Sequence, residues 1–296
     1  MSIKAPCLVE GLGYKCCFVS LRITVLDLSL AVLRDRVLIH QQYHRHGPDY
    51  RFGEQMTFLD VKQTFGFSHV RVGRWVTREE SLIAANLVFD SLADLAFILN
   101  LPPLTLGLRQ TLSLAFGHGG QKGVQAHYAP GARELALAKN AGAGALAHEF
   151  WHAFDHYVAP KAFSRATGRF KCASDLWLAD QPLIEHPLNH RLAEIFRVTL
   201  LSEDNLEPSD YVRRAIALDK RYGAQYFAKP TEMMARAFEA CIESYQGIQN
   251  PYLVSGTRYS ALAKEGAYPD EPHRQRIFNA LIAYFEPLGM ALGKTG

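Results

Sequence analysis

The chain of 296 residues is long enough to bury a sizeable core, and its hydrophobic (48%) and charged (21%) fractions exclude a chain that is disordered throughout. The net charge is only +3 and no dense run of Lys or Arg occurs, which argues against a nucleic-acid partner. The five cysteines are odd in number and lack a C-x-x-C pair, which argues against a disulfide framework and favours a cytoplasmic location.

The first 40 residues are the least interpretable part of the sequence. Residues 16–33 are apolar, but Arg22 and Asp27 interrupt them. A membrane span requires about twenty apolar residues with few or no charges, and no small-residue cleavage site of a signal peptide follows. We therefore expect residues 1–40 to form an N-terminal extension without a membrane role, and residues 41–296 to form one domain.

Hydrophobic periodicity predicts a helix, a strand and a second helix between residues 57 and 99. Residues 57–65 fit a short helix, and residues 70–76 alternate as a strand does. Thr77 and Glu80 have the spacing of a capping box, the signature of a helix start. Apolar residues then recur at three- and four-residue spacing as far as Leu99, which predicts a long buried helix.

Three strands and a series of helices are predicted next. Residues 111–116, 124–128 and 133–139 read as strands, and Pro130-Gly131 suits the central positions of a type II turn in a hairpin. A small antiparallel or mixed sheet followed by a mainly helical half belongs to the α+β class. The predicted helices cover residues 143–158, which end before Pro160, and residues 188–201, 209–222, 230–245 and 272–285.

The strongest functional motif is His148-Glu149-Phe150-Trp151-His152, which lies in a predicted helix after the hairpin. Residues four apart share one face of a helix, so both imidazoles can bind one metal ion. Glu149 lies beside the first histidine and can reach a metal-bound water without binding the metal. We therefore expect a catalytic Zn²⁺ site with Glu149 as general base, rather than a core helix with two satisfied histidines.

A catalytic zinc site of this kind needs a third protein ligand. The form H-E-x-x-H-x-x-G-x-x-H is excluded, because Asp155 and Val158 stand at the Gly and His positions. The best candidate is Glu232, in the first turn of a helix opened by Pro230, where the helix dipole favours a carboxylate. The competing candidates are Glu239, Glu185, His186, His190 and Glu194.

Three other residues close to the motif have more limited expected roles. Asp155 lies one turn after His152 and is a candidate acceptor for the second ring proton of a ligand histidine. His156 is out of line with the ligand pair and is expected to be structural. His127, in the hairpin, is expected to line the cleft without binding metal.

Two segments of the chain resemble gluzincin-type metallopeptidases, and both are similar to the catalytic domain of anthrax lethal factor. They are residues 148–157 and residues 230–239 (PTEMMARAFE). More closely, the chain resembles the CLCA_X family of bacterial proteins, which are akin to peptidase domains of large phage and plasmid polyproteins. The likeness runs from about residue 40 to near the C-terminus and includes Gly47-Pro48, Phe65-Gly66-Phe67, Gly73-Arg74-Trp75-Val76-Thr77, Ala126-His127-Tyr128, Ala138-Lys139-Asn140-Ala141-Gly142 and Ala147-His148-Glu149.

The resemblance implies a zincin-like fold in which His148, His152 and Glu232 bind zinc and Glu149 is the base. It also implies a tyrosine, shortly before the glutamate ligand, that supports the transition state. Tyr226 stands one residue away from that spacing, and Tyr222 is further away. A packed, half-exposed aromatic is the alternative interpretation of Tyr226.

We therefore expect a zinc-dependent hydrolase, in particular a peptidase. Its polypeptide substrate is expected to add as a strand along the edge formed by residues 133–139. Three alternatives stay open: a non-catalytic binding or scaffold protein stabilised by zinc, a nucleic-acid-associated protein of mobile elements, and a hydrolase of non-peptide amides.

Overall fold

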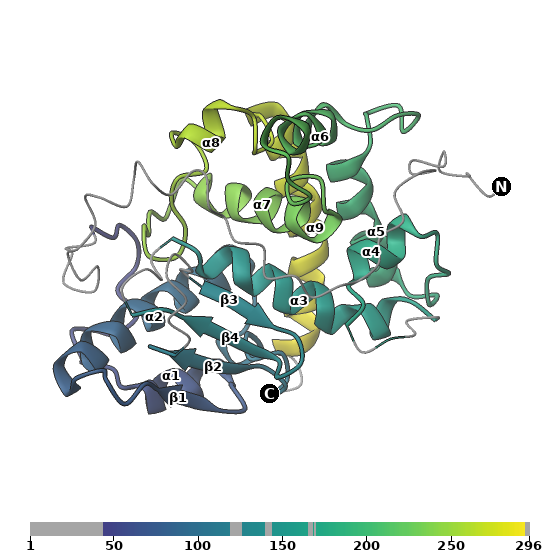
Figure 1. Ribbon diagram of the computed structural model, residues 1–296. Coiled ribbons are helices and arrows are strands. Elements are labelled where there is room, and N and C mark those ends of the chain that lie inside the picture. The colour runs from purple at the N-terminus through teal and green to yellow at the C-terminus, as the bar shows by residue number, and fades with distance from the viewer. Residues whose placement is uncertain (1–43, 119–125, 140–143, 165–167, 169, 294–296) are drawn as a thin grey trace.

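The computed structural model describes residues 44–118, 126–139, 144–164, 168 and 170–293. The expected N-terminal extension lies outside these residues. The described part is α+β, with one small mixed sheet and helices that make up about half of the chain. In Figure 1 the sheet occupies one end of the molecule and most of the C-terminal helices gather at the other.

Helices α1 (Phe58–Phe65) and α2 (Arg78–Ile98) both begin at capping boxes, of which the sequence predicts the one at Thr77. In each, a threonine accepts a hydrogen bond from the backbone of the residue three positions later, whose carboxylate accepts one in return. By length and composition α2 could cross a membrane. Most of its apolar window is buried inside the protein, which is the behaviour of a core helix.

The sheet has the strand order β1-β2-β4-β3, in which β3 alone runs antiparallel to its neighbour. The prediction that residues 133–139 form the open edge is wrong, because β4 pairs with β2 on one side and with β3 on the other. The edge beside the helical half is therefore β3. The strands are β1 (Val70–Val72), β2 (Ser113–Phe116), β3 (Ala126–Ala129) and β4 (Glu134–Leu137), with a short 3-10 helix, η3 (Pro103–Thr105), between α2 and β2.

The turn between β3 and β4 differs from the predicted type II turn. Ala129 pairs with Glu134, so the four-residue connection covers residues 130–133, one position later than the predicted residues 129–132. A type II turn requires a positive φ at its third residue, here Gly131. In the structure the left-handed residue is Arg133, with φ of 49°, and Gly131 lies outside the left-handed region.

The second half of the chain is helical, and its helices are longer or more numerous than the sequence predicts. Helix α3 continues through Pro160, which lies in its last turn, where the loss of one hydrogen bond is tolerated. Helices α4 and α8 are short and were not predicted. The bounds are α3 (Leu146–Ala162), α4 (Ala173–Leu178), α5 (Pro187–Leu200), α6 (Asp210–Tyr222), α7 (Pro230–Glu243), α8 (Ala261–Lys264) and α9 (Glu271–Gly293).

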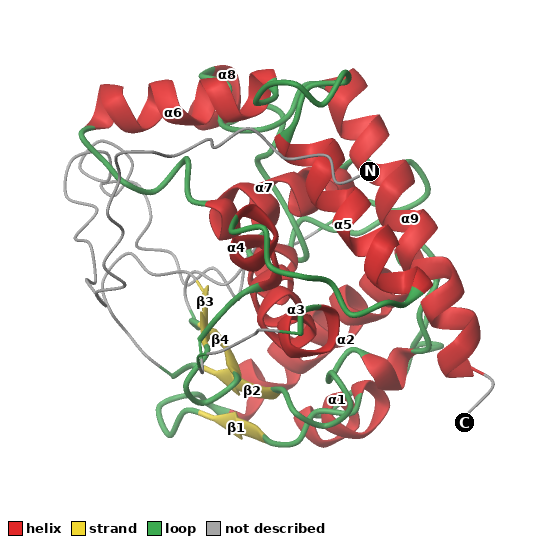
Figure 2. Ribbon diagram, turned by 90° about the vertical axis from the view of Figure 1, so that its right-hand side faces the viewer, coloured by secondary structure: helices red, strands yellow, loops and turns green. Residues whose placement is uncertain are grey.

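Helix α3 lies between the sheet and α7, as the nearly end-on view in Figure 2 shows. Trp151 is fully buried, with its ring centroid 4.9 Å from that of Phe238 on α7 and 5.4 Å from that of Phe154. Phe150 also approaches Phe238, at 6.4 Å. These aromatic contacts fix how α3 and α7 are rotated toward each other, and so which polar side chains meet between them.

Candidate metal site

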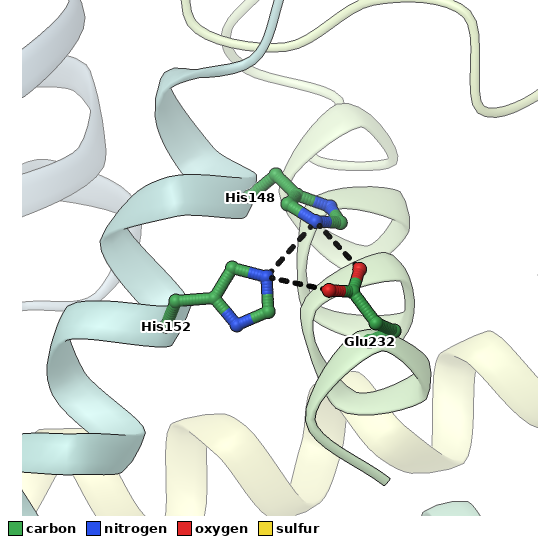
Figure 3. A group of neighbouring side chains, drawn as sticks. All are labelled: His148, His152 and Glu232. Atoms are coloured by element: carbon green, nitrogen blue, oxygen red, sulfur yellow. Dashed lines mark hydrogen bonds and ion pairs between the residues drawn. The ribbon is translucent and has the colours of Figure 1, made fainter. Parts of the chain in front are cut away.

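Three side chains from α3 and α7 converge on one point (Figure 3). The Nε2 atoms of His148 and His152 lie 3.2 Å apart. The Glu232 carboxylate faces both rings, with Oε2 at 3.4 Å from His148 Nε2 and Oε1 at 3.6 Å from His152 Nε2. The structure therefore brings Glu232 next to a pair of histidines that lies some eighty positions earlier in the sequence.

These separations suit a metal ion better than a hydrogen-bonded cluster. Zinc at about 2.0–2.1 Å from tetrahedral ligands keeps neighbouring ligand atoms about 3.3 Å apart. The distance of 3.2 Å between the two Nε2 atoms, and those of 3.4 and 3.6 Å from them to the two oxygens of Glu232, are close to this value. The donors are two imidazole nitrogens and a carboxylate oxygen, the set that zinc prefers in catalytic sites. The residues present therefore fit a zinc ion.

A second carboxylate holds the ring of His148. Glu239, two turns after Glu232 on α7, places Oε1 at 3.1 Å from His148 Nδ1. A proton on Nδ1 that is donated to Glu239 leaves the lone pair of Nε2 free to face the other donors. Glu239, which the sequence offers only as a competing ligand, thus contacts the opposite nitrogen of the ring.

Replacement of Glu239 by Gln is expected to weaken zinc binding about 10- to 100-fold, because His148 loses the acceptor that fixes its tautomer. The dissociation constant would be measured by competition with a fluorescent chelator. The matched control is Glu243→Gln, one turn later on α7, where the carboxylate binds backbone N–H groups of Gly256 and Thr257. An unchanged zinc affinity in Glu239→Gln would show that the contact with His148 is incidental.

The charges of the site are tightly coupled. Burial alone lowers the pKa of His148, but the carboxylates of Glu239, Glu232 and Glu149 raise it well above its usual range. Burial also lowers the pKa of His152, but Glu232 raises it, and the net pKa lies above the usual value. Burial raises the pKa of Glu232, yet its hydrogen bonds to the two imidazoles lower it well below the usual value. The metal-free site therefore favours imidazolium groups around a carboxylate.

Zinc affinity is expected to depend steeply on pH. Because the pKa of both imidazoles is raised, each holds its proton at pH values where a free histidine, with a pKa of about 6.5, has lost it. A metal ion must displace these protons, so the affinity rises with pH above about 6.5, by up to about two logarithmic units per pH unit. Chelator competition between about pH 6 and 9 measures the slope, and a flat profile would contradict the assignment.

Glu149, the predicted base, lies beside the edge strand. Its Oε2 accepts a hydrogen bond of 2.7 Å from the backbone N–H of Tyr128 in β3. That N–H therefore points away from β4 and toward α3. Its negative charge also helps to raise the pKa of both His148 and His152, so the carboxylate acts on these rings while it contacts the backbone of β3.

Tyr226 approaches the site from the loop before α7. Burial, and then the negative charge of Glu232, raise the pKa of its hydroxyl well above the usual value. The side chain is 37% exposed, and the Arg236 guanidinium lies 5.5 Å from the ring centroid. Tyr222, the alternative, donates its hydroxyl proton to Glu265. Of the two tyrosines, Tyr226 is the one whose pKa is raised by the charge of a candidate ligand.

The loop that carries Tyr226 is organised by Asp219, which the sequence analysis did not single out. Its carboxylate accepts hydrogen bonds from three successive backbone N–H groups, those of Tyr226 at 2.9 Å and of Phe227 and Ala228 at 2.8 Å. An aspartate near a helix C-terminus is common, so its spacing alone does not reveal this role. The contact fixes the backbone immediately before the helix that bears Glu232.

The other predicted residues lie away from the three donors or contact different partners. Both oxygens of Asp155 accept hydrogen bonds from Ser174 at the start of α4, so the expected contact with a ligand histidine is replaced by Glu239. His156 Nδ1 lies 2.7 Å from the Tyr128 hydroxyl, as a structural residue would. His127 is exposed on β3. Among the competing ligands, Glu185 pairs with His190, His186 caps α5, and Glu194 pairs with Arg197.

Comparison with known proteins gives one partial match. Residues 218–292 match the family model of large polyvalent protein-associated domain 1. This segment includes Tyr226, Glu232 and Glu239 but not α3, so the similarity covers only one side of the candidate site. No curated protein and no solved structure matches the chain significantly.

Proposed function

We propose that this protein is a zinc-dependent hydrolase with a zincin-like domain, and in particular a peptidase. The observation that carries the proposal is the triangle formed by His148, His152 and Glu232, with Glu149 adjacent to it. A bound Zn²⁺ would act there as a Lewis acid and lower the pKa of water to about 7. A purely structural zinc site is usually closed by four protein ligands, whereas the described residues offer three.

The surrounding residues suit amide hydrolysis. The Glu149 carboxylate takes the proton of the attacking water and passes it to the leaving amine. The Tyr226 hydroxyl, whose pKa is raised well above its usual value, stays protonated at neutral pH and donates a hydrogen bond to the developing oxyanion. These two groups come from α3 and from the loop before α7, which leaves the side toward β3 for the substrate.

The edge strand supports a polypeptide substrate. Among the described residues β3 pairs with β4 alone, and its Tyr128 N–H points outward to Glu149. An extended peptide that adds beside β3 would form main-chain hydrogen bonds with this edge and bring a peptide bond next to the base. This arrangement replaces the edge at residues 133–139 that the sequence suggests.

Tyr226→Phe is expected to lower kcat by about 10- to 100-fold with little change in KM, because the hydroxyl acts only as charge develops. The matched control is Tyr222→Phe, which removes a hydroxyl of the same loop region that binds Glu265. Steady-state kinetics on one cleaved peptide would separate the two constants. An equal loss in both variants would assign the effect to packing instead.

The proposed activity is tested with a proteome-derived peptide library, analysed by mass spectrometry for new termini. Zinc-loaded wild type is expected to generate them, whereas chelator-treated wild type and His148→Ala are not. Restored cleavage on return of zinc to the treated wild type separates metal dependence from loss of fold. Cleavage by His148→Ala at the wild-type rate would contradict the proposal.

A further inference from the structure

A buried arginine lies on α7, one turn after the candidate ligand Glu232. Arg236 is only 4% exposed, and no carboxylate of the described part of the chain forms an ion pair with it. Arginines are almost never fully buried unless they are paired, because a charge that leaves water needs partners in the protein. The contacts that replace the missing carboxylate therefore show what this side chain holds.

Arg236 is bound by two backbone carbonyl groups and lies against two aromatic rings. Its Nε donates to Ala267 O at 3.1 Å and its Nη2 donates to Phe227 O, whereas Nη1 has no hydrogen-bond partner among the described residues. The guanidinium carbon lies 5.5 Å from the ring centroid of Tyr226 and 5.4 Å from that of Phe227. One side chain on α7 thus fastens the loop before α7 and the loop before α9.

The loop that carries Tyr226 is held by opposite charges from two helices. Asp219 on α6 accepts hydrogen bonds from the backbone N–H groups of residues 226–228. Arg236 on α7 donates to the carbonyl oxygen of Phe227, in the middle of the same segment. Hydrogen bonds to charged groups are stronger than neutral ones, so this short segment is firmly held on both its donor and its acceptor side. We call Arg236 and Asp219 the loop clamp.

We propose that the loop clamp positions the Tyr226 hydroxyl for the reaction at the candidate metal site, an inference that rests on the proposed function. Glu232 and Arg236 are four residues apart on α7 and share one face of this helix. An arginine that holds Phe227 O therefore also sets how the preceding tyrosine lies toward the candidate ligand. The Tyr226 side chain is 37% exposed, so the clamp holds its backbone while part of the ring stays accessible to a substrate.

The contacts of Arg236 depend on the shape of a guanidinium. Its planar fork offers donors in fixed directions, so one side chain binds carbonyl groups from two loops at once. A lysine keeps the charge but has a single compact ammonium group, so Arg236→Lys loosens the loop without removing the cation. The matched control is Arg214→Lys. Arg214, on α6, donates to Gly266 O at 3.4 Å and to Tyr268 O at 3.3 Å, and none of its described contacts is with the loop before α7.

The test is a double-mutant cycle in steady-state kinetics, with Arg236→Lys made both in wild type and in Tyr226→Phe. In wild type it is expected to lower kcat about tenfold with little change in KM, because a small misplacement of a reacting group costs up to about a hundredfold. In Tyr226→Phe it is expected to lower kcat less than about twofold, since the hydroxyl that it positions is already absent. Arg214→Lys is expected to keep kcat within about twofold in both backgrounds.

Two further measurements do not depend on activity. Zinc affinity of Arg236→Lys is expected to stay within about threefold of wild type, because the side chain binds backbone carbonyls rather than a candidate ligand. The backbone N–H groups of residues 226–228 are expected to exchange with deuterium about tenfold faster in Arg236→Lys than in wild type or Arg214→Lys. Asp219→Asn loosens the same loop from its N–H side and is expected to show the same dependence on Tyr226, which provides a second variant should Arg236→Lys not fold.

Two results would overturn the inference. They are an equal loss of kcat in wild type and in Tyr226→Phe, which would assign the effect to general packing, and unchanged exchange of residues 226–228, which would show that the clamp does not hold the loop. Wild type that cleaves no peptide would instead overturn the proposed function, and with it the catalytic role of the clamp. Circular dichroism of each variant excludes misfolding as the cause of a loss.

Discussion

Glu149→Gln is expected to keep its full zinc content and to lower kcat/KM for peptide cleavage about a thousandfold, within the 10²–10⁴ range typical of general base catalysis. The substituted amide has nearly the same shape as the carboxylate, and its oxygen can still accept the hydrogen bond from Tyr128 N–H. It cannot take a proton from water at neutral pH. The variant therefore removes the chemistry of the base while it preserves the geometry around it.

Metal content would be measured by inductively coupled plasma mass spectrometry, and activity with a peptide that wild type cleaves. Glu185→Gln provides the control, since that carboxylate is 88% exposed and lies on a surface ion pair. Activity of Glu149→Gln within about tenfold of wild type would exclude Glu149 as the base. Loss of zinc together with activity would instead assign it to metal binding.

Glu232→Ala is expected to weaken zinc binding by a factor of about 10²–10³. Zinc sites with four protein ligands bind with about 10–16 kcal/mol, or roughly 2.5–4 kcal/mol for each ligand. Removal of Glu232 leaves only two imidazoles, 3.2 Å apart, to hold the ion. The loss should exceed that of Glu239→Gln, because Glu232 faces the Nε2 atoms themselves whereas Glu239 contacts the far side of one ring.

Thermal unfolding gives an independent measurement of the same effect. Wild type should gain thermal stability as zinc is added, since a ligand that binds only the folded chain stabilises it. Glu232→Ala should show little gain at the same zinc concentration. Glu232→Asp, whose carboxylate is withdrawn by one methylene, should fall between them. If zinc raised the thermal stability of Glu232→Ala as much as that of wild type, another residue would have to complete the site.

Local sequence signals predict the main helices of this protein well, but they predict poorly which strands lie next to each other in the sheet. The capping box at Thr77 marks a helix start in the sequence because it involves residues only three positions apart. Strand order depends on pairing between distant segments, so the sequence could not show that β4 lies inside the sheet. The buried run in Leu135–Leu137 is typical of such a central strand, whereas β3 contains the exposed His127.

In the candidate site, too, contacts within one helix can be predicted from the sequence, whereas contacts between distant helices cannot. His148 and His152 belong to one helix turn, so their spacing alone brings them together. The contact of Glu239 with His148 depends on the rotation of α7 against α3, which Trp151 and Phe238 fix by packing. Asp155 has the right spacing for that contact, but α4, which the sequence did not predict, brings Ser174 to its carboxylate.

Net charge is a poor guide to local charge in this chain. The value of +3 argues against a nucleic-acid partner when it is taken as an average over the chain. The fold brings two stretches without acidic residues to one end of the sheet, where Arg133 and Tyr157 line one recess and Lys161 lies over the Tyr157 ring. A uniform spread of charge along the sequence therefore becomes a local excess on the surface.

The central claim, that α3 and α7 together form a catalytic zinc site, is tested most directly by zinc K-edge X-ray absorption on the purified chain. The spectrum is expected to show about two imidazole nitrogens, together with carboxylate and water oxygens, at about 2.0–2.1 Å. Zinc that is bound through sulfur at about 2.3 Å, or that lacks the imidazole signal, would contradict the account.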